Sequence, residues 1–187
     1  MRKVTYLMST SLDGYIVGPD GRFDWSEPDD ELFRFFIDET RKLGVHLMGR
    51  KLYETMLYWE TAAEEPDLDE ATRDWISVWN PLPKVVFSRT LTTVQGNARL
   101  ASGSVAEEIE RLKGEQTDGD IAIGGATLAA EVAALDLMDE YQVVVLPVLV
   151  GGGIPYFAHN GRQTNLTLVE TRTFEPGSVF LRYSVNR

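Results

Sequence analysis

Cysteine is absent from the 187 residues of this chain. Its absence excludes disulfide bonds, thiolate metal sites and cysteine nucleophiles, and it is typical of proteins in a reducing compartment. No apolar run approaches the roughly 18 residues that a membrane-spanning helix needs, and the first residues lead into a strand pattern instead of a signal peptide. We therefore expect a cytoplasmic protein without a membrane partner.

Basic residues are also scarce, with 18 Lys and Arg against 29 Asp and Glu, which gives a formal net charge of −11. Nucleic acids and anionic membranes select basic surfaces, so neither is an expected partner. Any anionic ligand must be held by a few local groups. The cations that follow predicted strands, Arg50, Lys51 and Arg89, are therefore informative.

Several motifs of known chemistry are missing as well. The chain contains no G-x-G-x-x-G or Walker A sequence, no H-E-x-x-H or zinc-deaminase pattern, and no G-x-S-x-G elbow. Its two histidines, His46 and His159, are far apart in sequence, and His46 lies in a strand pattern, where a structural role is expected. We expect neither a metal site nor a Rossmann dinucleotide fold.

Residues 120–131 organise the rest of the pattern. The apolar residues up to Ile123 suit a buried strand, and an alanine-rich helix begins after Gly124 and Gly125. Such a junction presents free backbone N–H groups and the positive end of a helix dipole, which suits an anionic ligand. A tight strand-to-helix turn without a ligand is the alternative, and this stretch alone does not separate the two.

Periodicity along the chain predicts strands that alternate with helices and end in a hairpin around residues 175–178. The predicted strands are residues 3–9, 45–48, 84–87, 120–123, 142–146, 166–174 and 179–185, and helices are predicted over about 26–43, 51–57, a segment ending at 79, 105–113 and the residues after 126. We therefore expect residues 1–187 to form a single α/β domain with three layers, a mostly parallel central sheet and an antiparallel C-terminal hairpin.

Two further predicted strands end in turns that suit an anion. Gly49, Arg50 and Lys51 begin a helix, and cations at a helix N-terminus oppose the dipole unless an anion lies between them. Ser88 and Arg89 follow the strand at residues 84–87 and offer a hydroxyl and a cation. Ligands of open α/β sheets gather at the carboxyl ends of strands, so we predict one anion-binding edge. Solvated basic residues are the alternative.

A proline-containing stretch before the first helix holds the candidate catalytic acids. Ser26 is predicted to cap this helix. The stripe predicted to face the core comprises Leu32, Phe33, Phe36, Ile37 and Leu43. Asp29 and Asp30 either complement the helix dipole or, beside Trp25 and Phe33 as substrate-binding residues, occupy a pocket in which a raised pKa lets one of them handle a proton. Trp25 either packs against a planar ligand or closes over the core.

The ordered set of motifs resembles the dihydrofolate reductase-like superfamily, specifically stand-alone relatives of the reductase domain that forms the C-terminal half of the bacterial riboflavin-biosynthesis deaminase/reductase. Each piece is unspecific alone, but the series has the right order and spans nearly the whole chain. The matching pieces are Ser11-Leu12-Asp13-Gly14-Tyr15-Ile16, Met48-Gly49-Arg50-Lys51-Leu52-Tyr53-Glu54, Val86-Phe87-Ser88-Arg89, Ile123-Gly124-Gly125-Ala126-Thr127-Leu128 and Pro147-Val148-Leu149-Val150-Gly151-Gly152-Gly153.

The resemblance implies NADPH as the hydride donor and a small heterocyclic or ribosylamine substrate. The first candidate is 5-amino-6-(5-phosphoribosylamino)uracil and the second is dihydrofolate. The resemblance also implies that Ser88 and Arg89 contact the adenosine 2′-phosphate, and that Asp30 or Asp29 is the proton-handling acid next to Trp25. The other implied cofactor contacts are Gly49, Arg50 and Lys51 at the phosphates, and Gly124, Gly125, Ala126, Thr127 and Leu128 at the pyrophosphate.

Three features depart from the family pattern. Leu52 stands where these reductases often have Thr, which removes one hydroxyl for a phosphate. The deaminase half has no counterpart in these residues, and riboflavin-type reductases do not reliably place the acid as dihydrofolate reductase does. A non-catalytic nucleotide-binding or interaction module that keeps the fold is therefore the alternative to an NADPH-dependent reductase. The apolar run at residues 146–150 and the terminal hairpin predict a homodimer, and the resemblance implies the same because relatives commonly form homodimers.

Overall fold

The computed structural model describes residues 2–186, and its centre is an eight-stranded sheet. The strands are β1 (Val4–Ser11), β3 (Leu43–Gly49), β4 (Lys84–Phe87), β5 (Ala98–Leu100), β6 (Asp120–Gly124), β7 (Glu140–Leu146), β9 (Leu166–Phe174) and β10 (Ser178–Val185). Their order across the sheet is β5-β4-β3-β6-β1-β7-β10-β9. The first six in this order are parallel, β10 runs antiparallel to β7, and β9 runs antiparallel to β10. This confirms the predicted mostly parallel sheet with an antiparallel end.

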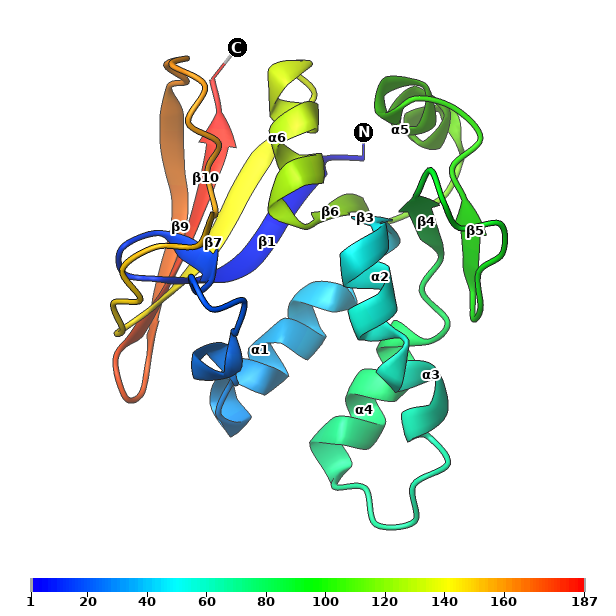
Figure 1. Cartoon of the computed structure of the whole chain (residues 1–187), viewed down its shortest axis with the longest axis horizontal. Coiled ribbons are helices and arrows are strands. Elements are labelled where there is room, and N and C mark those ends of the chain that lie inside the picture. The colour runs from blue at the N-terminus through cyan, green and yellow to red at the C-terminus, as the bar shows by residue number, and fades with distance from the viewer. Residues whose placement is uncertain (1, 187) are drawn as a thin grey trace.

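Helices cover both faces of the sheet and complete a three-layer α/β architecture (Figure 1). One face carries α5 (Val105–Gly114) and α6 (Ala126–Ala134), and the other carries α1 (Asp30–Thr40) and α4 (Glu70–Trp79) together with the short α2 (Arg50–Met56) and α3 (Tyr58–Ala62). A small sheet of β2 (Tyr15–Val17) and β8 (Ile154–Pro155) and the short 3₁₀ helix η1 (Asp24–Ser26) lie beside the main sheet.

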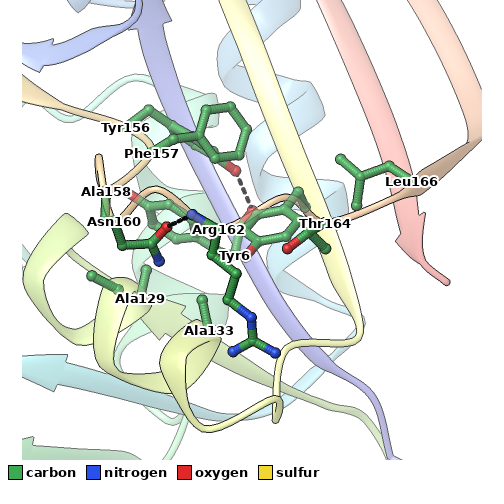
Figure 2. Close-up of a pocket in the computed structure, with 12 residues that line it drawn as sticks. Tyr6, Ala129, Ala133, Tyr156, Phe157, Ala158, Asn160, Arg162, Thr164 and Leu166 are labelled. Atoms are coloured by element: carbon green, nitrogen blue, oxygen red, sulfur yellow. Dashed lines mark hydrogen bonds between the residues drawn. The ribbon is translucent and has the colours of Figure 1, made fainter. Parts of the chain in front are cut away.

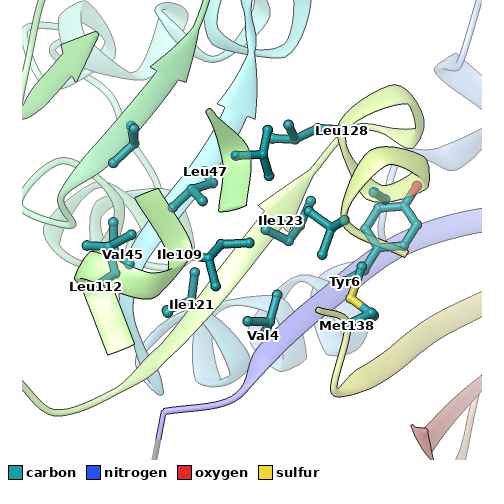
Figure 3. Close-up of a cluster of buried hydrophobic side chains, with 14 of the residues drawn as sticks. Val4, Tyr6, Val45, Leu47, Ile109, Leu112, Ile121, Ile123, Leu128 and Met138 are labelled. Carbon is teal, nitrogen blue, oxygen red and sulfur yellow. The ribbon is translucent and has the colours of Figure 1, made fainter. Parts of the chain in front are cut away.

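The core under α5 and α6 is built from alternate residues of the central strands. Val4 and Tyr6 of β1 and Val45 and Leu47 of β3 point to this face, because side chains of a strand alternate between its two faces. Figure 3 shows them packed against Ile109, Leu112 and Leu128 of the two helices.

The opposite face holds two further clusters that contain most of the aromatic side chains. Met48 and Val86 pack against Trp75 and Trp79 of α4, whose rings stack with centroids 5.3 Å apart. Closer to the hairpin, Phe35 of α1 packs against Phe174 and Phe180. These clusters fix α1 and α4 to the sheet.

The first long helix begins later than the sequence predicted. Its N-cap is Asp29, whose side chain accepts a hydrogen bond from the backbone N–H of Leu32 at 2.9 Å, and not Ser26, which belongs to η1. Pro28 disfavours a helical conformation at the residue before it, so the helix begins after the proline. The predicted end was also wrong, because α1 ends at Thr40 and Leu43 begins β3. Of the predicted stripe, Leu32 and Ile37 are buried, whereas Phe33 and Phe36 are only partly buried. Phe35, which the predicted stripe left out, is buried.

Within residues 2–186, no helix combines the length and the apolar character that crossing a membrane would require. No group of three or more His, Asp or Glu side chains in this part of the chain is arranged to hold a metal ion.

Candidate functional site

The parallel strands bring three predicted turns to one edge of the sheet. β3 lies between β4 and β6, with Gly49 paired to Phe87 and Met48 paired to Gly124. The segments after these strand ends are therefore neighbours, although they are far apart in sequence. The carboxyl edge of the sheet is thus the candidate functional site, as expected for a parallel α/β sheet.

Arg50 and Thr90 connect two of these turns directly. The Nη1 atom of Arg50 donates to Oγ1 of Thr90 at 2.8 Å, and its Nε donates to Glu54 at 2.7 Å. The Ser88 hydroxyl accepts from the backbone N–H groups of Thr90, at 3.2 Å, and Leu91, at 3.0 Å. Ser88 therefore shapes the turn after β4, and Arg50 spans from the start of α2 to that turn.

Two cations at this edge have no side-chain partner in the part of the chain that the structure describes. The side chains of Lys51 and Arg89 are exposed, and no hydrogen bond or ion pair involves either of them within residues 2–186. In a chain with a net charge of −11, neighbouring acids could easily neutralise such groups. The edge instead keeps positive charge that an anion can use.

The N-terminus of α6 lacks the side-chain cap that other long helices have. Asp29, Asp69 and Ser104 cap α1, α4 and α5 through their own side chains. At α6 the N-cap is Gly125, which has φ of 92°, makes no side-chain cap and is followed by no acid in the first turn. The first N–H groups of a helix have no intrahelical acceptor, so this end remains a donor site for an anion.

The residues of this first turn differ in what they offer a ligand. Thr127 is exposed and Ala126 is partly buried, whereas the Leu128 side chain is in the core under α6. Leu128 can therefore contribute only its backbone N–H at this edge. The structure thus brings together Gly49, Arg50, Lys51, Ser88, Arg89, Gly124, Gly125, Ala126, Thr127 and Leu128.

Gly124 and Gly49 at this edge differ in whether the surrounding chain leaves room for a larger side chain. A Cβ atom on Gly124 would lie 2.4 Å from the His46 ring and 2.4 Å from Leu52, so the packing of the chain itself requires glycine there. Gly49 has φ of −77°, and a Cβ atom on it would meet nothing within 4 Å. Neither conformation nor packing requires glycine at position 49, and the open space beside it suits the close approach of a ligand.

The residues predicted to handle a substrate lie on the α1 side of the sheet. The Asp29 carboxylate is used as the N-cap of α1, and Asp30 is exposed in the first turn. Trp25 is partly buried against the cluster that includes Phe35, and its Nε1 is buried without a hydrogen-bond partner. Phe33 packs against Trp75, with ring centroids 5.9 Å apart, and so belongs to the neighbouring cluster.

Sequence analysis assigned no role to Asp13, which joins two loops at the carboxyl ends of β1 and β7. Its carboxylate accepts hydrogen bonds from the backbone N–H groups of Gly151, at 2.7 Å, and Val150, at 3.2 Å. The Ser11 hydroxyl, followed by these N–H groups, lowers the pKa of Asp13. The signal was the combination of Ser11-Leu12-Asp13-Gly14 with a glycine-rich loop, since an acid can satisfy the exposed amides of such a loop.

His46 lies beneath the edge, and its buried Nδ1 atom makes no hydrogen bond within residues 2–186. Burial, followed by the positive charge of Lys84, lowers the pKa of His46 to about 4. Burial also lowers the pKa of Lys84 to about 8, and its Nζ donates to the backbone oxygens of Trp79 at 2.7 Å and Leu82 at 3.0 Å. His46 is thus neutral near pH 7, and its ring packs edge-on against Trp79.

Comparison with known proteins agrees with this architecture. Residues 2–180 match the model of the RibD C-terminal domain family. The chain belongs to this family. An uncharacterized protein of Bacillus subtilis, YyaP, is 31% identical over 99% of this chain and 96% of its own length. The expected relationship to the RibD C-terminal domain family, with a reductase-related fold, is therefore confirmed.

Two solved structures support the fold assignment. A putative riboflavin biosynthesis protein from Shewanella sp. PV-4 is 23% identical, with a TM-score of 0.78 over 99% of both chains. Dihydrofolate reductase from Enterococcus faecalis, in complex with NADP(H), is 12% identical, with a TM-score of 0.65 over 99% of this chain and 97% of that chain. At these identities the comparison establishes the fold alone, which is dihydrofolate reductase-like.

Proposed function

We propose that this protein is an NADPH-dependent reductase of a small heterocyclic or ribosylamine substrate. The observation that carries the proposal is the carboxyl edge of the sheet. There the uncapped N-terminus of α6, the linked Arg50 and Thr90, and the exposed Arg89 follow the ends of the three adjacent strands β6, β3 and β4. A dinucleotide with several phosphates needs donors and cations spread over such an edge.

The residues at this edge fit the phosphates of NADPH. The N–H groups at the start of α6 would hold the pyrophosphate, with Gly49 leaving space beside it. Arg89, together with the Ser88 and Thr90 hydroxyls, would hold the adenosine 2′-phosphate, which distinguishes NADPH from NADH. Arg50 would position the turn after β4, because it already donates to Thr90.

When bound, NADPH supplies a hydride for an electrophilic carbon of the substrate. The contribution of the chain is to orient the two reactants, to exclude water and to deliver a proton. Asp30 is the better candidate for the proton, directly or through water, because the Asp29 carboxylate already accepts the Leu32 N–H. The preferred substrate is 5-amino-6-(5-phosphoribosylamino)uracil, of the riboflavin pathway, and dihydrofolate is the second candidate.

A non-catalytic nucleotide-binding module is the second candidate function, and Leu52 is the observation that favours it. The Leu52 side chain packs against Gly124, so position 52 contributes no hydroxyl to the edge. Such a protein would keep the nucleotide site without completing the reaction.

One experiment separates these functions. NADPH binding is measured by the change in nicotinamide fluorescence, and its oxidation is then followed by absorbance with each candidate substrate. Oxidation with the ribosylaminouracil supports the reductase of the riboflavin pathway. Binding without oxidation by either substrate supports the binding module, and the absence of NADPH binding contradicts both.

A further inference from the structure

A cavity of about 240 Å³ lies on the α6 side of the sheet. None of the residues that line it belongs to the predicted cofactor, catalytic or substrate-binding residues. Its walls are α6, the strands β1 and β7, and the segment at residues 156–166 that passes in front of them (Figure 2). Apolar cavities of about 150 Å³ hold benzene, so this volume accommodates a substituted single ring or a small fused ring.

The cavity is aromatic on one side and lined by small residues on the other. Tyr6 and Tyr156 stack with ring centroids 4.4 Å apart, and Phe157 packs edge-on against both Tyr156, at 4.5 Å, and Tyr141, at 5.4 Å. The facing wall consists of alanines of α6, including Ala133. A planar ring fits between a flat aromatic surface and a helix that has no large side chains there.

The Tyr6 hydroxyl is buried beside this cavity. Tyr6 is fully buried, and within residues 2–186 its hydroxyl oxygen has no hydrogen-bond partner. The adjacent Tyr156 differs, because its hydroxyl contacts the backbone oxygens of Tyr6 at 2.9 Å and Gln142 at 3.0 Å. Burial raises the pKa of the Tyr6 hydroxyl, so the group stays protonated and can donate. Buried polar groups nearly always have a hydrogen-bond partner, so a ligand atom that accepts from this hydroxyl would stabilise it.

The charge at the rim is already neutralised. Arg162 lies at the mouth of the cavity and forms an ion pair with Asp136 at 2.5 Å. An anionic ligand would compete with that carboxylate in a chain of net charge −11, whereas a neutral ligand would disturb neither partner.

We propose that this cavity is a second binding site, separate from the carboxyl edge, for a small neutral aromatic compound with a carbonyl or ring-nitrogen acceptor for the Tyr6 O–H. The ring lies between the aromatic wall and the alanines of α6, and the acceptor reaches the base of the cavity.

Three matched probes test the site by titration of the ¹⁵N-labelled full chain, followed by NMR. Benzamide has a ring and an acceptor, toluene has only the ring, and cyclohexanecarboxamide has only the acceptor. Benzamide should bind with a Kd on the order of 1 mM and shift the amides of Ala129, Ala133 and Tyr141, and it should bind more tightly than the other two.

Two variants assign the contacts. Tyr6→Phe should weaken benzamide about 3- to 10-fold while leaving toluene unchanged and the melting temperature equal or higher, because it removes only an unpaired buried hydroxyl. Ala133→Leu should abolish binding of every probe by filling the cavity, whereas the matched control Ala134→Leu, at an exposed position of the same helix, should not.

Several outcomes would overturn the proposal. Absence of saturable shifts with benzamide would do so, as would binding that survives Ala133→Leu. Equal benzamide affinity in the wild type and Tyr6→Phe would show that the hydroxyl is satisfied by water and selects no ligand. Self-association that Ala133→Leu abolishes, with no probe binding, would assign the cavity to a second copy of the chain.

Discussion

The guanidinium of Arg50 donates to the hydroxyl of Thr90 at 2.8 Å, across 40 residues of sequence. This contact links the turn after β3 to the turn after β4, whereas the neighbouring Arg89 is exposed and has no side-chain partner among residues 2–186. One arginine thus orders the edge while the other is available to a ligand. The difference leads directly to a test of cofactor choice.

Arg89→Glu should weaken NADPH binding about 10- to 100-fold and NADH binding by much less, because only NADPH carries the 2′-phosphate that Arg89 is proposed to contact. Fluorescence titration with both nucleotides measures the two losses. Arg73→Glu makes the same charge reversal at an exposed position of α4 and should change the affinity for neither nucleotide. Equal losses for both nucleotides in Arg89→Glu would refute the assignment to the 2′-phosphate.

Alanine at Gly49 and at Gly124 should have opposite consequences. Gly124→Ala should lower the free energy of unfolding by about 1 to 3 kcal/mol, because the new methyl group meets His46 and Leu52. Gly49→Ala should change it by less than about 1 kcal/mol and instead weaken NADPH at least severalfold, since its methyl group enters the open space. Urea unfolding and nucleotide titration give both values. Unchanged NADPH affinity in Gly49→Ala would remove that space from the binding site.

His46 should make the protein less stable in acid. Burial, then the charge of Lys84, lowers the pKa of His46 from 6.5 to about 4. Between these values the unfolded chain binds a proton that the folded chain resists, so stability falls as the pH falls through this window. The contribution is about 2 to 3 kcal/mol. This loss of unfolding free energy should be absent from His46→Gln when urea unfolding is measured at pH 7 and at pH 4. His159→Gln, at an exposed residue, is the control, and an unchanged pH dependence in His46→Gln would contradict the assignment.

On the α6 side of the sheet, no helix of the described residues lies over the hairpin of β9 and β10 (Figure 1). On the α6 side of the sheet β10 offers Val179, Leu181, Tyr183 and Val185, all partly exposed. The charged Arg182 points to the other side, where it pairs with Glu39 at 2.8 Å. A second copy offers the same uncharged surface, which matters because two chains of net charge −11 otherwise repel. We propose that the homodimer predicted from sequence forms through this face of β10.

Leu181→Lys should therefore convert a dimer into a monomer, since two lysines would be buried opposite each other. Light scattering after size-exclusion chromatography measures the mass, and circular dichroism verifies that the variant is folded. The control Thr167→Lys places the same charge on the opposite face of β9. A wild-type monomer at micromolar concentration, or a dimer that tolerates Leu181→Lys, would show that this face is not the interface.

The sequence was most informative where periodicity was strong. The strands at residues 84–87 and 166–174 were predicted with their observed bounds, because apolar runs and polar–apolar alternation are local signals. The strands β2, β5 and β8 were not predicted, since two or three residues carry no period and pair only with distant partners. The start of α1 was misplaced because Ser26 and Asp29 are both good caps, and only the backbone after Pro28 decides between them.

The candidate site was predictable to a similar extent. Glycines and cations after strands indicated the edge, and the parallel topology explains why they meet there. The hydrogen bonds of Asp13 and the full burial of the Tyr6 hydroxyl could not be predicted, because both depend on loops that return from more than a hundred residues away. Sequence also could not tell that Gly124 is required by packing and Gly49 is not.

The order β4-β3-β6 has a consequence for how the molecule responds to a ligand. The three turns that would hold one nucleotide follow three different strands, and only the side-by-side pairing of these strands brings the turns together. Binding and cooperative unfolding are then coupled, and a saturating nucleotide should slow amide exchange even in strands it never touches. A nucleotide bound at this edge would therefore stabilise the whole sheet against opening.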